Sequence, residues 1–167
     1  MRKTMIALAC AATLAGADLR VQLQVSSPQG GLRDVAGGRL GYGLGVHTEI
    51  ALVNGDTLRP RADLSFFPVL KLAGIENRYS SLGLGCDYLH HLPGRLDSFY
   101  LVGGASVLRW STQTVGMGSG DTTRLGLSLG AGVRVTASLG WEGRYSYSPL
   151  SQDIKARTLG MGFTYRF

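Results

Sequence analysis

Lysine is nearly absent from this sequence, which contains only Lys3, Lys71 and Lys155. Arginine therefore carries most of the positive charge, and the formal net charge is +6. The arginines stand singly within apolar alternations, and no known nucleic-acid-binding motif is present. Proteins that bind nucleic acid typically gather basic residues on one face or in one motif, so we expect no nucleic-acid partner.

The sequence also lacks an apolar run long enough to cross a bilayer as a helix, which takes about 20 residues. Its start has the pattern of an export signal: a positive beginning, a short apolar stretch over 5–14, and small residues at 15–17. We therefore expect a cleaved signal peptide over 1–17 and one mature domain over 18–167. A lipoprotein signal at Cys10 is the weaker alternative, because the apolar run before it is short.

Cysteine is scarce, and removal of the signal peptide leaves Cys86 alone, which excludes an internal disulfide. The histidines are His47, His90 and His91. Three histidines and one cysteine form no convincing metal-binding pattern, so we expect neither a metal nor a cofactor.

Apolar residues alternate with small or polar ones through almost the whole mature sequence, which is the pattern of β-strands. Eight stretches show it: 19–26, 39–52, 57–67, 79–88, 99–110, 123–135, 139–147 and 159–167. Long connections mostly alternate with short ones, as in an up-and-down meander. Eight antiparallel strands joined in this way close into a barrel without a free edge.

Two of the stretches are less regular. Pro60 lies within the third, which suggests a strand end or a bulge. The fifth carries apolar residues on both faces, and we assign Tyr100, Val102, Leu108 and Trp110 to its apolar face, which places Arg109 on the other.

The polar face of the strands distinguishes a soluble barrel from a membrane barrel. It carries glycine, serine and single arginines, rather than the lysine and glutamate of a solvated surface. Small residues suit the narrow interior of a small barrel, and the apolar face then meets lipid. The predicted fold class is therefore all-β, an eight-stranded antiparallel up-and-down transmembrane β-barrel, with a soluble ligand carrier as the alternative. Aromatic residues near the strand ends would form its interfacial girdles: Tyr42, Tyr88, Trp110, Trp141 and Tyr147.

The last stretch ends on alternating apolar residues: Leu159, Met161, Phe163, Tyr165 and Phe167. Together with the export signal and the eight strands, this ending resembles the small outer-membrane barrels of the OmpA/OmpX type. The resemblance implies that these five residues are the assembly signal read by the barrel-assembly machinery during insertion. It also implies a monomer in the bacterial outer membrane, in contact with lipid and lipopolysaccharide, with both termini and the short turns in the periplasm.

Charged residues on the polar face are expected to pair across the lumen. A hairpin centred on Gly55 would pair Glu49 with Arg61, and His47 with Asp63. Because isolated buried charges are costly, we expect a lumen charge network that holds the barrel rigid. The alternative is a polar lining for a narrow water or ion path. The other residues predicted in this network are Asp87, Arg134, Glu142 and Arg144.

The predicted function is non-enzymatic, with a structural or surface-interaction role. A narrow channel or small-solute conduit is the alternative. A lipid A-modifying enzyme is less expected, because such barrels use a serine, a histidine and an acid near the outer rim, whereas the three histidines fall toward the periplasmic rim. We expect the long connections to be a solvated rim, with contact to lipopolysaccharide phosphates or host molecules as the alternative. Their charged residues are Arg33, Asp34, Lys71, Glu76, Asp121, Asp153 and Lys155.

Overall fold

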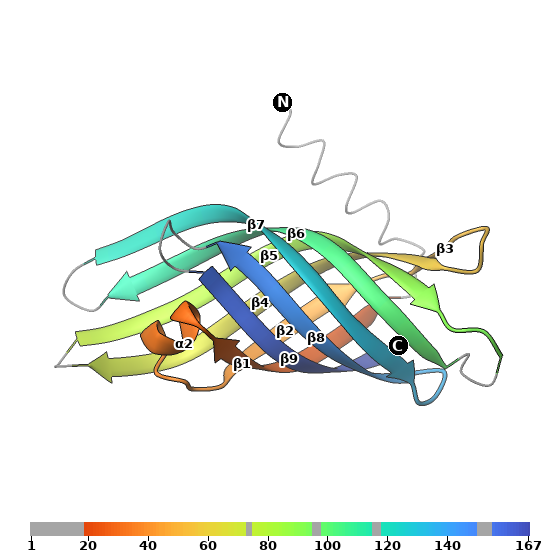
Figure 1. Cartoon of the computed structure of the whole chain (residues 1–167), viewed down its shortest axis with the longest axis horizontal. Helices are drawn as coiled ribbons and strands as arrows, with labels where there is room; N and C mark the ends of the chain where they lie inside the picture. Colours follow the sequence, from red (N-terminus) through yellow and green to blue (C-terminus); the bar gives the residue numbers. More distant parts are fainter. Residues whose placement is uncertain (1–18, 73–74, 95–97, 115–117, 150–154) are drawn as a thin grey trace, which may run out of the picture.

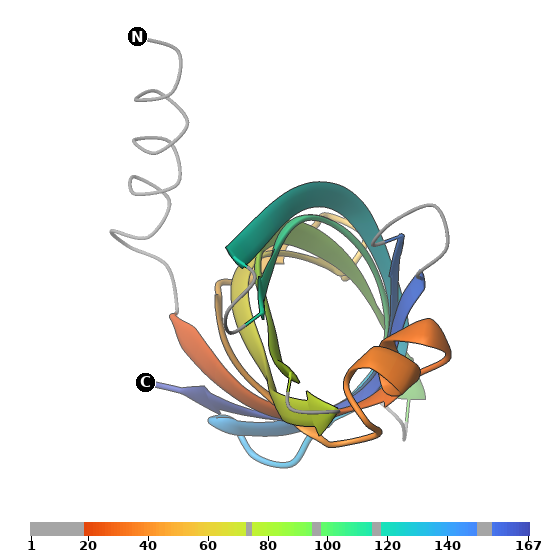
Figure 2. The same ribbon diagram turned by 90° about the vertical axis from the view of Figure 1, so that its left-hand side faces the viewer.

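Eight strands close into one antiparallel barrel in the computed structural model, which describes residues 19–72, 75–94, 98–114, 118–149 and 155–167. The strand order is β2-β1-β9-β8-β7-β6-β5-β4, and β2 pairs with β4 to close the barrel (Figures 1 and 2). A ninth, two-residue strand, β3, pairs only with β4. The elements are β1 (Arg20–Gln29), α2 (Gly31–Val35), β2 (Gly41–His47), β3 (Ile50–Ala51), β4 (Thr57–Leu72), β5 (Ile75–His91), β6 (Phe99–Thr114), β7 (Gly118–Arg134), β8 (Leu139–Pro149) and β9 (Lys155–Arg166).

The predicted fold class is confirmed, because each of the eight alternating stretches overlaps one barrel strand. We call the two rims the terminal end and the helix end. The terminal end holds the start of β1, the end of β9 and the β3–β4 turn, and the helix end holds α2 (Figure 1). The predicted signal peptide lies outside the described residues.

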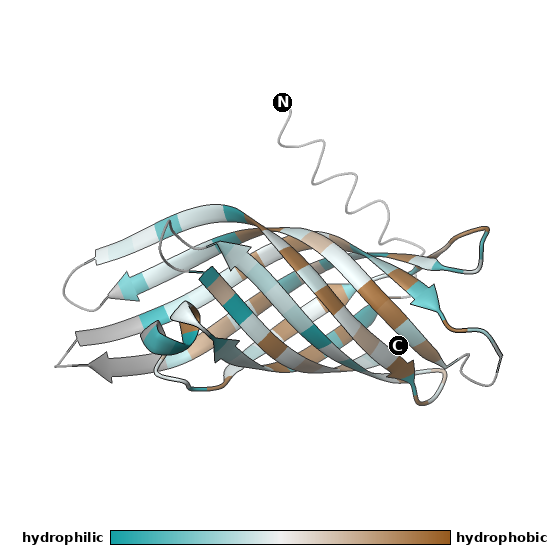
Figure 3. Ribbon diagram, in the orientation of Figure 1, coloured by the Kyte–Doolittle hydropathy of each residue, from teal (hydrophilic) through white to brown (hydrophobic). Residues whose placement is uncertain are grey.

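The outward faces of the strands are apolar, and the inward faces are polar. Figure 3 shows the matching alternation of hydrophobic and more hydrophilic residues along the strands. Leu125 and Leu129 on β7 are each 70% exposed, whereas Ser128 between them is buried. Side chains of a strand alternate between its two faces, so this pattern places the apolar set outside and the polar set in the lumen. Within the described residues, no helix is long and apolar enough to cross a membrane.

Strand β6 has the opposite orientation from the one expected. Tyr100, Val102 and Trp110 are at most 5% exposed and face the interior, while Arg109 faces outward. The prediction was wrong because both faces of this strand are apolar. The inward residues pack in two interior apolar layers: Tyr100 and Val102 lie with Leu89, and Trp110 lies beneath α2.

The β2–β4 register also differs from the predicted one by two residues. His47 lies opposite Arg61, so it does not face Asp63. The loop is centred on Asn54 rather than on Gly55. Gly55 has φ 86° at the end of a three-residue loop, where its N–H donates to the Leu52 carbonyl at 3.0 Å. A positive φ at the last position of such a loop is typical of glycine and fixes the hairpin register.

Pro60 lies inside β4, where it is neither a strand end nor part of the strand's one register shift, which falls between Phe67 and Leu70. It interrupts the neighbouring strand instead. The Thr48 N–H donates to the Pro60 carbonyl at 3.2 Å, but proline has no N–H to return the bond. The gap between β2 and β3 falls at this position.

Two predicted long connections are mostly strand. β4 and β5 continue to Leu72 and Ile75, and β6 and β7 continue to Thr114 and Gly118. The four strands from β4 to β7 therefore extend beyond β8 and β9 at the helix end (Figure 1). Pairing between neighbouring strands stabilises these extensions, in which apolar and polar residues alternate less regularly along the sequence.

The connection between β1 and β2 contains the helix α2, which the sequence analysis did not predict. Two of its neighbouring glycines, Gly30 and Gly37, have positive φ angles of 55° and 62°. Leu32 and Ala36 are fully buried against Phe67 and Trp110. We call this buried apolar group, together with Ala156, the apolar cap, because it lies at the helix end of the barrel.

Candidate functional site

The middle of the lumen holds a compact group of charged side chains from three strands, which we call the central cluster. Its members are Arg59, Arg61 and Asp63 on β4, Asp87 on β5, and Glu142 and Arg144 on β8. Three guanidinium groups face three carboxylates, so the cluster is formally neutral. Each side chain is at most 10% exposed.

Asp87 is the hub of the central cluster and is completely buried. Its Oδ2 accepts from Arg144 Nη2 at 2.8 Å and from Arg59 Nη2 at 3.0 Å. Its Oδ1 accepts from Arg61 Nε at 3.1 Å. Charge-assisted hydrogen bonds from three arginines compensate the desolvation of this carboxylate.

Glu142 is the second bridging carboxylate of the cluster. Arg59 Nη2 donates to its Oε2 at 2.7 Å, and Arg144 Nε donates to its Oε1 at 3.0 Å. The Tyr100 hydroxyl also donates to Oε2, at 3.1 Å. These bonds connect β4, β6 and β8 across the lumen, and Arg61 pairs with Asp63 at the edge of the group.

A second ion-paired group lies nearer the terminal end. Glu49 Oε2 lies 2.8 Å from Arg20 Nη2 and 2.9 Å from Arg134 Nη2. Glu49 thus does not pair with Arg61, because the register shift places Arg61 in the central cluster. His47 is buried near this group, and its Nε2 has no hydrogen-bond partner among the described residues.

The predicted lumen residues therefore divide into two groups rather than one. Asp63, Asp87, Glu142, Arg61 and Arg144 meet in the central cluster, whereas Glu49 and Arg134 meet near the terminal end. Sequence reasoning had not assigned Arg20, Arg59 or Tyr100 to the network. Arg59 shares the inward face of β4 with Arg61 and Asp63, so its place in the alternation would have identified it.

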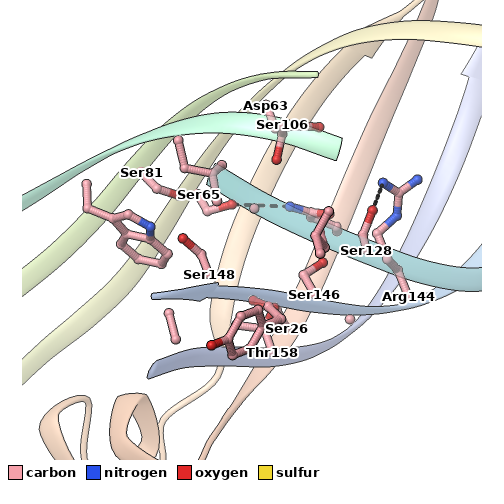
Figure 4. A pocket seen from close by; sticks show the side chains of 18 of the residues that line it. Ser26, Asp63, Ser65, Ser81, Ser106, Ser128, Arg144, Ser146, Ser148 and Thr158 are labelled. Carbon is pink, nitrogen blue, oxygen red and sulfur yellow. Dashed lines mark hydrogen bonds between the residues drawn. The ribbon is translucent and has the colours of Figure 1, made fainter. Parts of the chain in front are cut away.

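A cavity of about 80 Å³ lies between the central cluster and the apolar cap (Figure 4). Arg61, Asp63 and Arg144 border it on one side, and Phe67 and Trp110 border it on the other. Hydroxyl groups from six strands, which we call the serine belt, line the space between: Ser26, Ser65, Ser81, Ser106, Ser128 and Ser148. Arg144 Nη1 donates to Ser128 Oγ at 3.3 Å, so the belt is joined to the central cluster.

The predicted girdle residues are mostly outside. Tyr42, Tyr88 and Trp141 are 58%, 41% and 48% exposed, and Tyr147 is half-buried on the same outward face of β8 as Trp141. Trp110 is the exception, since it lies inside the barrel and belongs to the apolar cap.

The predicted assembly signal forms the outward face of β9 and the residue after it. Leu159, Met161, Tyr165 and Phe167 are exposed, and the Phe163 ring packs against Trp141 with centroids 5.3 Å apart. β9 pairs with β1 along ten residues and so joins the two ends of the described chain.

A small polar group fastens the β3–β4 turn to β5 at the terminal end, outside the barrel wall. Asp56 accepts hydrogen bonds from the Tyr88 hydroxyl and from Asn54 Nδ2, and its Oδ1 lies 3.0 Å from His90 Nδ1. The Tyr88 hydrogen bond is the main reason that the pKa of Asp56 lies below its ordinary value. Asp56 also accepts from the backbone N–H of His91.

The histidines do not assemble a catalytic relay among the described residues. His91 Nε2 lies 2.9 Å from Thr57 Oγ1, but Asp56 contacts the ring of His90 and only the backbone of His91. Within the same part of the chain, no group of three His, Cys, Asp or Glu side chains is placed to hold a metal ion.

The charged residues predicted for the long connections are spread over several elements at the helix end. Arg33 and Asp34 lie in α2, and Lys155 begins β9. Asp121 lies on β7 and pairs with Arg109 at 2.6 Å. Lys71 and Glu76 lie opposite each other on β4 and β5, and Asp153 lies outside the described residues.

Comparison with solved structures shows what the barrel resembles. Neisserial surface protein A (NspA) superimposes with a TM-score of 0.63 at 15% identity, over 92% of this chain and 98% of that one. Ail, the attachment invasion locus protein of Yersinia pestis, gives 0.58 at 16% identity, over 90% and 97%. The outer-membrane enzyme PagL gives 0.56 at 13% identity, over 89% and 99%.

The fold is that of the small eight-stranded outer-membrane β-barrels. This agrees with the family that the sequence resembles. No protein-family model matches the sequence, and the comparison with curated proteins gives no match.

Proposed function

We propose that this protein is an integral outer-membrane β-barrel with a structural or surface-interaction role and a closed lumen. The observation that carries the proposal is the central cluster. Six buried charged side chains from β4, β5 and β8 neutralise one another across the middle of the barrel. Such a network ties opposite walls together and leaves no free charge there to attract an ion.

The outer wall supports the membrane location. Its strands present leucine, valine and aromatic side chains outward around the barrel, as a lipid-facing belt requires. In water, a continuous exposed apolar surface of this extent would favour aggregation. The outer-membrane proteins with the same fold support the proposal that lipid surrounds this outer wall.

A narrow conduit is the less favoured role. Ions would have to pass the central cluster, where the side chains are at most 10% exposed. Opening a path would require guanidinium–carboxylate pairs in a low-dielectric interior to separate, and breaking buried pairs is strongly unfavourable.

An enzymatic role is also less favoured. The PagL neighbour shows that this fold can support an enzyme. Here, however, the hydroxyl, imidazole and carboxylate groups at the terminal end do not connect in one relay.

Lipopolysaccharide is the partner we propose for the outer surface at the helix end. Lys155 and Arg157 are exposed on the outward face of β9, beyond the apolar residues that begin at Leu159. Cationic side chains at the border of the apolar belt suit the phosphates of this lipid. The helix end would then face outside the cell and the terminal end the periplasm, with the outward face of β9 engaging the barrel-assembly machinery during insertion.

Conductance in planar bilayers tests the closed lumen. The purified, folded protein should give no defined openings, and Asp87→Ala, which removes the hub of the central cluster, should raise the frequency of openings if it folds. Arg109→Ala, which disrupts an exposed pair outside the lumen, is the matched control. Regular openings of the unaltered protein that Asp87→Ala modifies would favour the conduit role instead.

A further inference from the structure

The wall formed by β4, β5 and β6 contains a cavity of about 450 Å³ near the helix end, which we call the wall cavity. It lies at a bulge of β4. From Phe67 to Leu70 the chain advances three residues on β4, but it advances only two on β5, from Tyr79 to Asn77. Pro68, inside the bulge, also has no N–H to donate to β5. Because a bulge leaves a residue unpaired and bends its strand, the backbone itself forms this cavity.

Part of the lining is apolar and continues the outer wall of the barrel. Phe66, which is 50% exposed, lines the cavity together with Pro68. On the terminal side of the cavity, Leu82 and Leu84 of β5 are 53% and 57% exposed on the outward face. An acyl chain that lies along these leucines therefore has an apolar path into the cavity, against Phe66 and Pro68.

The rest of the lining on β5 and β6 is polar and carries a positive charge. Ser80 lies opposite Ser111, and the exposed Arg78 lies opposite Gln113, one outward position nearer to the helix end. No acidic side chain is among the described residues that line the cavity. A guanidinium group binds phosphate with two parallel hydrogen bonds. The two serine hydroxyls and the Gln113 amide both donate and accept, so they suit the hydroxyl groups of a sugar.

Apolar, hydroxyl and cationic groups thus follow one another along this wall toward the helix end, and a phosphorylated glycolipid carries acyl chains, sugar and phosphate to match them. We propose that the wall cavity is a binding site for one lipid A moiety of lipopolysaccharide, with a phosphate on Arg78 and an acyl chain against Phe66. The inference rests on the proposed function, in which the helix end faces outside the cell. It adds a site of defined shape on β4–β6 to the surface cations Lys155 and Arg157 of β9.

Nuclear magnetic resonance of the ¹⁵N-labelled protein in detergent micelles can follow each site separately. The backbone amides of Ser80 and Ser111 report on the wall cavity, and the amide of Arg157 reports on β9. We suggest titration with lipid A, dephosphorylated lipid A, phosphatidylglycerol and inorganic phosphate. Lipid A should shift the two serine amides saturably, with a dissociation constant at least about tenfold lower than those of the other three probes, because only lipid A offers phosphate, sugar and acyl chain together. Equal affinity for phosphatidylglycerol or for inorganic phosphate would overturn the proposal.

Arg78→Ala removes the proposed phosphate contact without altering the bulge. It should raise the dissociation constant of lipid A, measured at the serine amides, about tenfold, as expected for loss of charge-assisted hydrogen bonds. Arg124→Ala is the matched control, because Arg124 is also exposed near the helix end but does not line the cavity. It should leave that constant unchanged. An Arg78→Ala variant that folds, as judged by its gel migration, and binds lipid A as tightly as the unaltered protein would contradict the assignment.

The same titration separates failure of this site from failure of the proposed function. If lipid A shifts the Arg157 amide but neither serine amide, the wall cavity is not a site, while the proposed contact of β9 with lipopolysaccharide stands. If lipid A shifts none of the three amides, both proposals are contradicted.

Discussion

Gly104 lies opposite Asp87 on the β5–β6 ladder, and a Cβ atom at Gly104 would overlap Asp87 Oδ1. The missing side chain of one residue thus makes room for the hub of the central cluster. Alanine at this position would force Asp87 to move away from its arginine partners. We expect Gly104→Ala to lower the free energy of unfolding by about 1–3 kcal/mol, the usual cost of overpacking.

Urea unfolding in micelles or vesicles measures this effect, and the adjacent glycine supplies the control. Gly103 faces outward, and a Cβ there would lie 3.5 Å from Leu129 Cδ2, an ordinary contact. Gly103→Ala should therefore be close to neutral. Equal stability of the two alanine variants would show that Asp87 is not held where the structure places it.

Asp87→Asn tests the charge of the hub while keeping its shape. Three guanidinium groups would then face a neutral amide in a buried site, and loss of one member of a buried ion pair costs about 3–5 kcal/mol. Asp121→Asn affects an exposed pair with Arg109 and should cost at most about 1 kcal/mol. If Asp87→Asn lowers the free energy of unfolding no more than Asp121→Asn does, the central cluster does not stabilise the barrel as described.

Asp56 gives the barrel a pH-dependent contact at the terminal end. The hydrogen bond from Tyr88 lowers the pKa of Asp56 in the folded state, so the carboxylate stabilises the fold above its unfolded pKa of about 4. This stabilisation is lost as the pH falls through the folded pKa. The stability difference between the unaltered protein and Asp56→Asn should therefore shrink below pH 4.

Tyr88→Phe removes the main cause of that shift, so the same comparison made in a Tyr88→Phe background should show a smaller difference near pH 7. Unfolding midpoints measured across this pH range report both effects. A difference that does not shrink as the pH falls from 5 to 3 would contradict the lowered pKa of Asp56 in the folded state.

Phe167 follows the last ladder residue of β9 and is 79% exposed. Its deletion removes no strand pairing, so we expect the folded barrel to lose less than about 1 kcal/mol. Insertion in cells should fall severalfold, because the resemblance assigns this residue to the assembly signal. Val53→Ala, which changes an exposed apolar residue at the same end, is the control. Comparable membrane levels of both variants would speak against the assembly role.

The alternation in the sequence was sufficient to predict the eight strands, because a lipid-facing wall and a packed lumen require opposite residue types on each strand. The rule failed at β6, where Tyr100 and Trp110 are apolar but face inward to interior apolar layers. The register of the β2–β4 hairpin depended on the conformation of Gly55, which spacing alone does not reveal.

The candidate site was predictable only in part. The alternation along each strand placed Asp87 and Glu142 on the inward face, but it did not show which arginines each carboxylate contacts, since this depends on strand tilt and register. The helix α2 was also missed. Its five residues are too few for a clear helical period, although the glycines on both sides mark a turn.

The central claim is that this chain is a closed barrel embedded in the outer membrane. Migration on an SDS gel with and without boiling, applied to protein extracted from the outer membrane, tests it most directly. A closed barrel satisfies its backbone hydrogen bonds internally, so the unboiled sample should stay folded and migrate differently from the boiled one. Identical migration of the two samples, together with recovery of the protein in the soluble periplasmic fraction, would contradict the account.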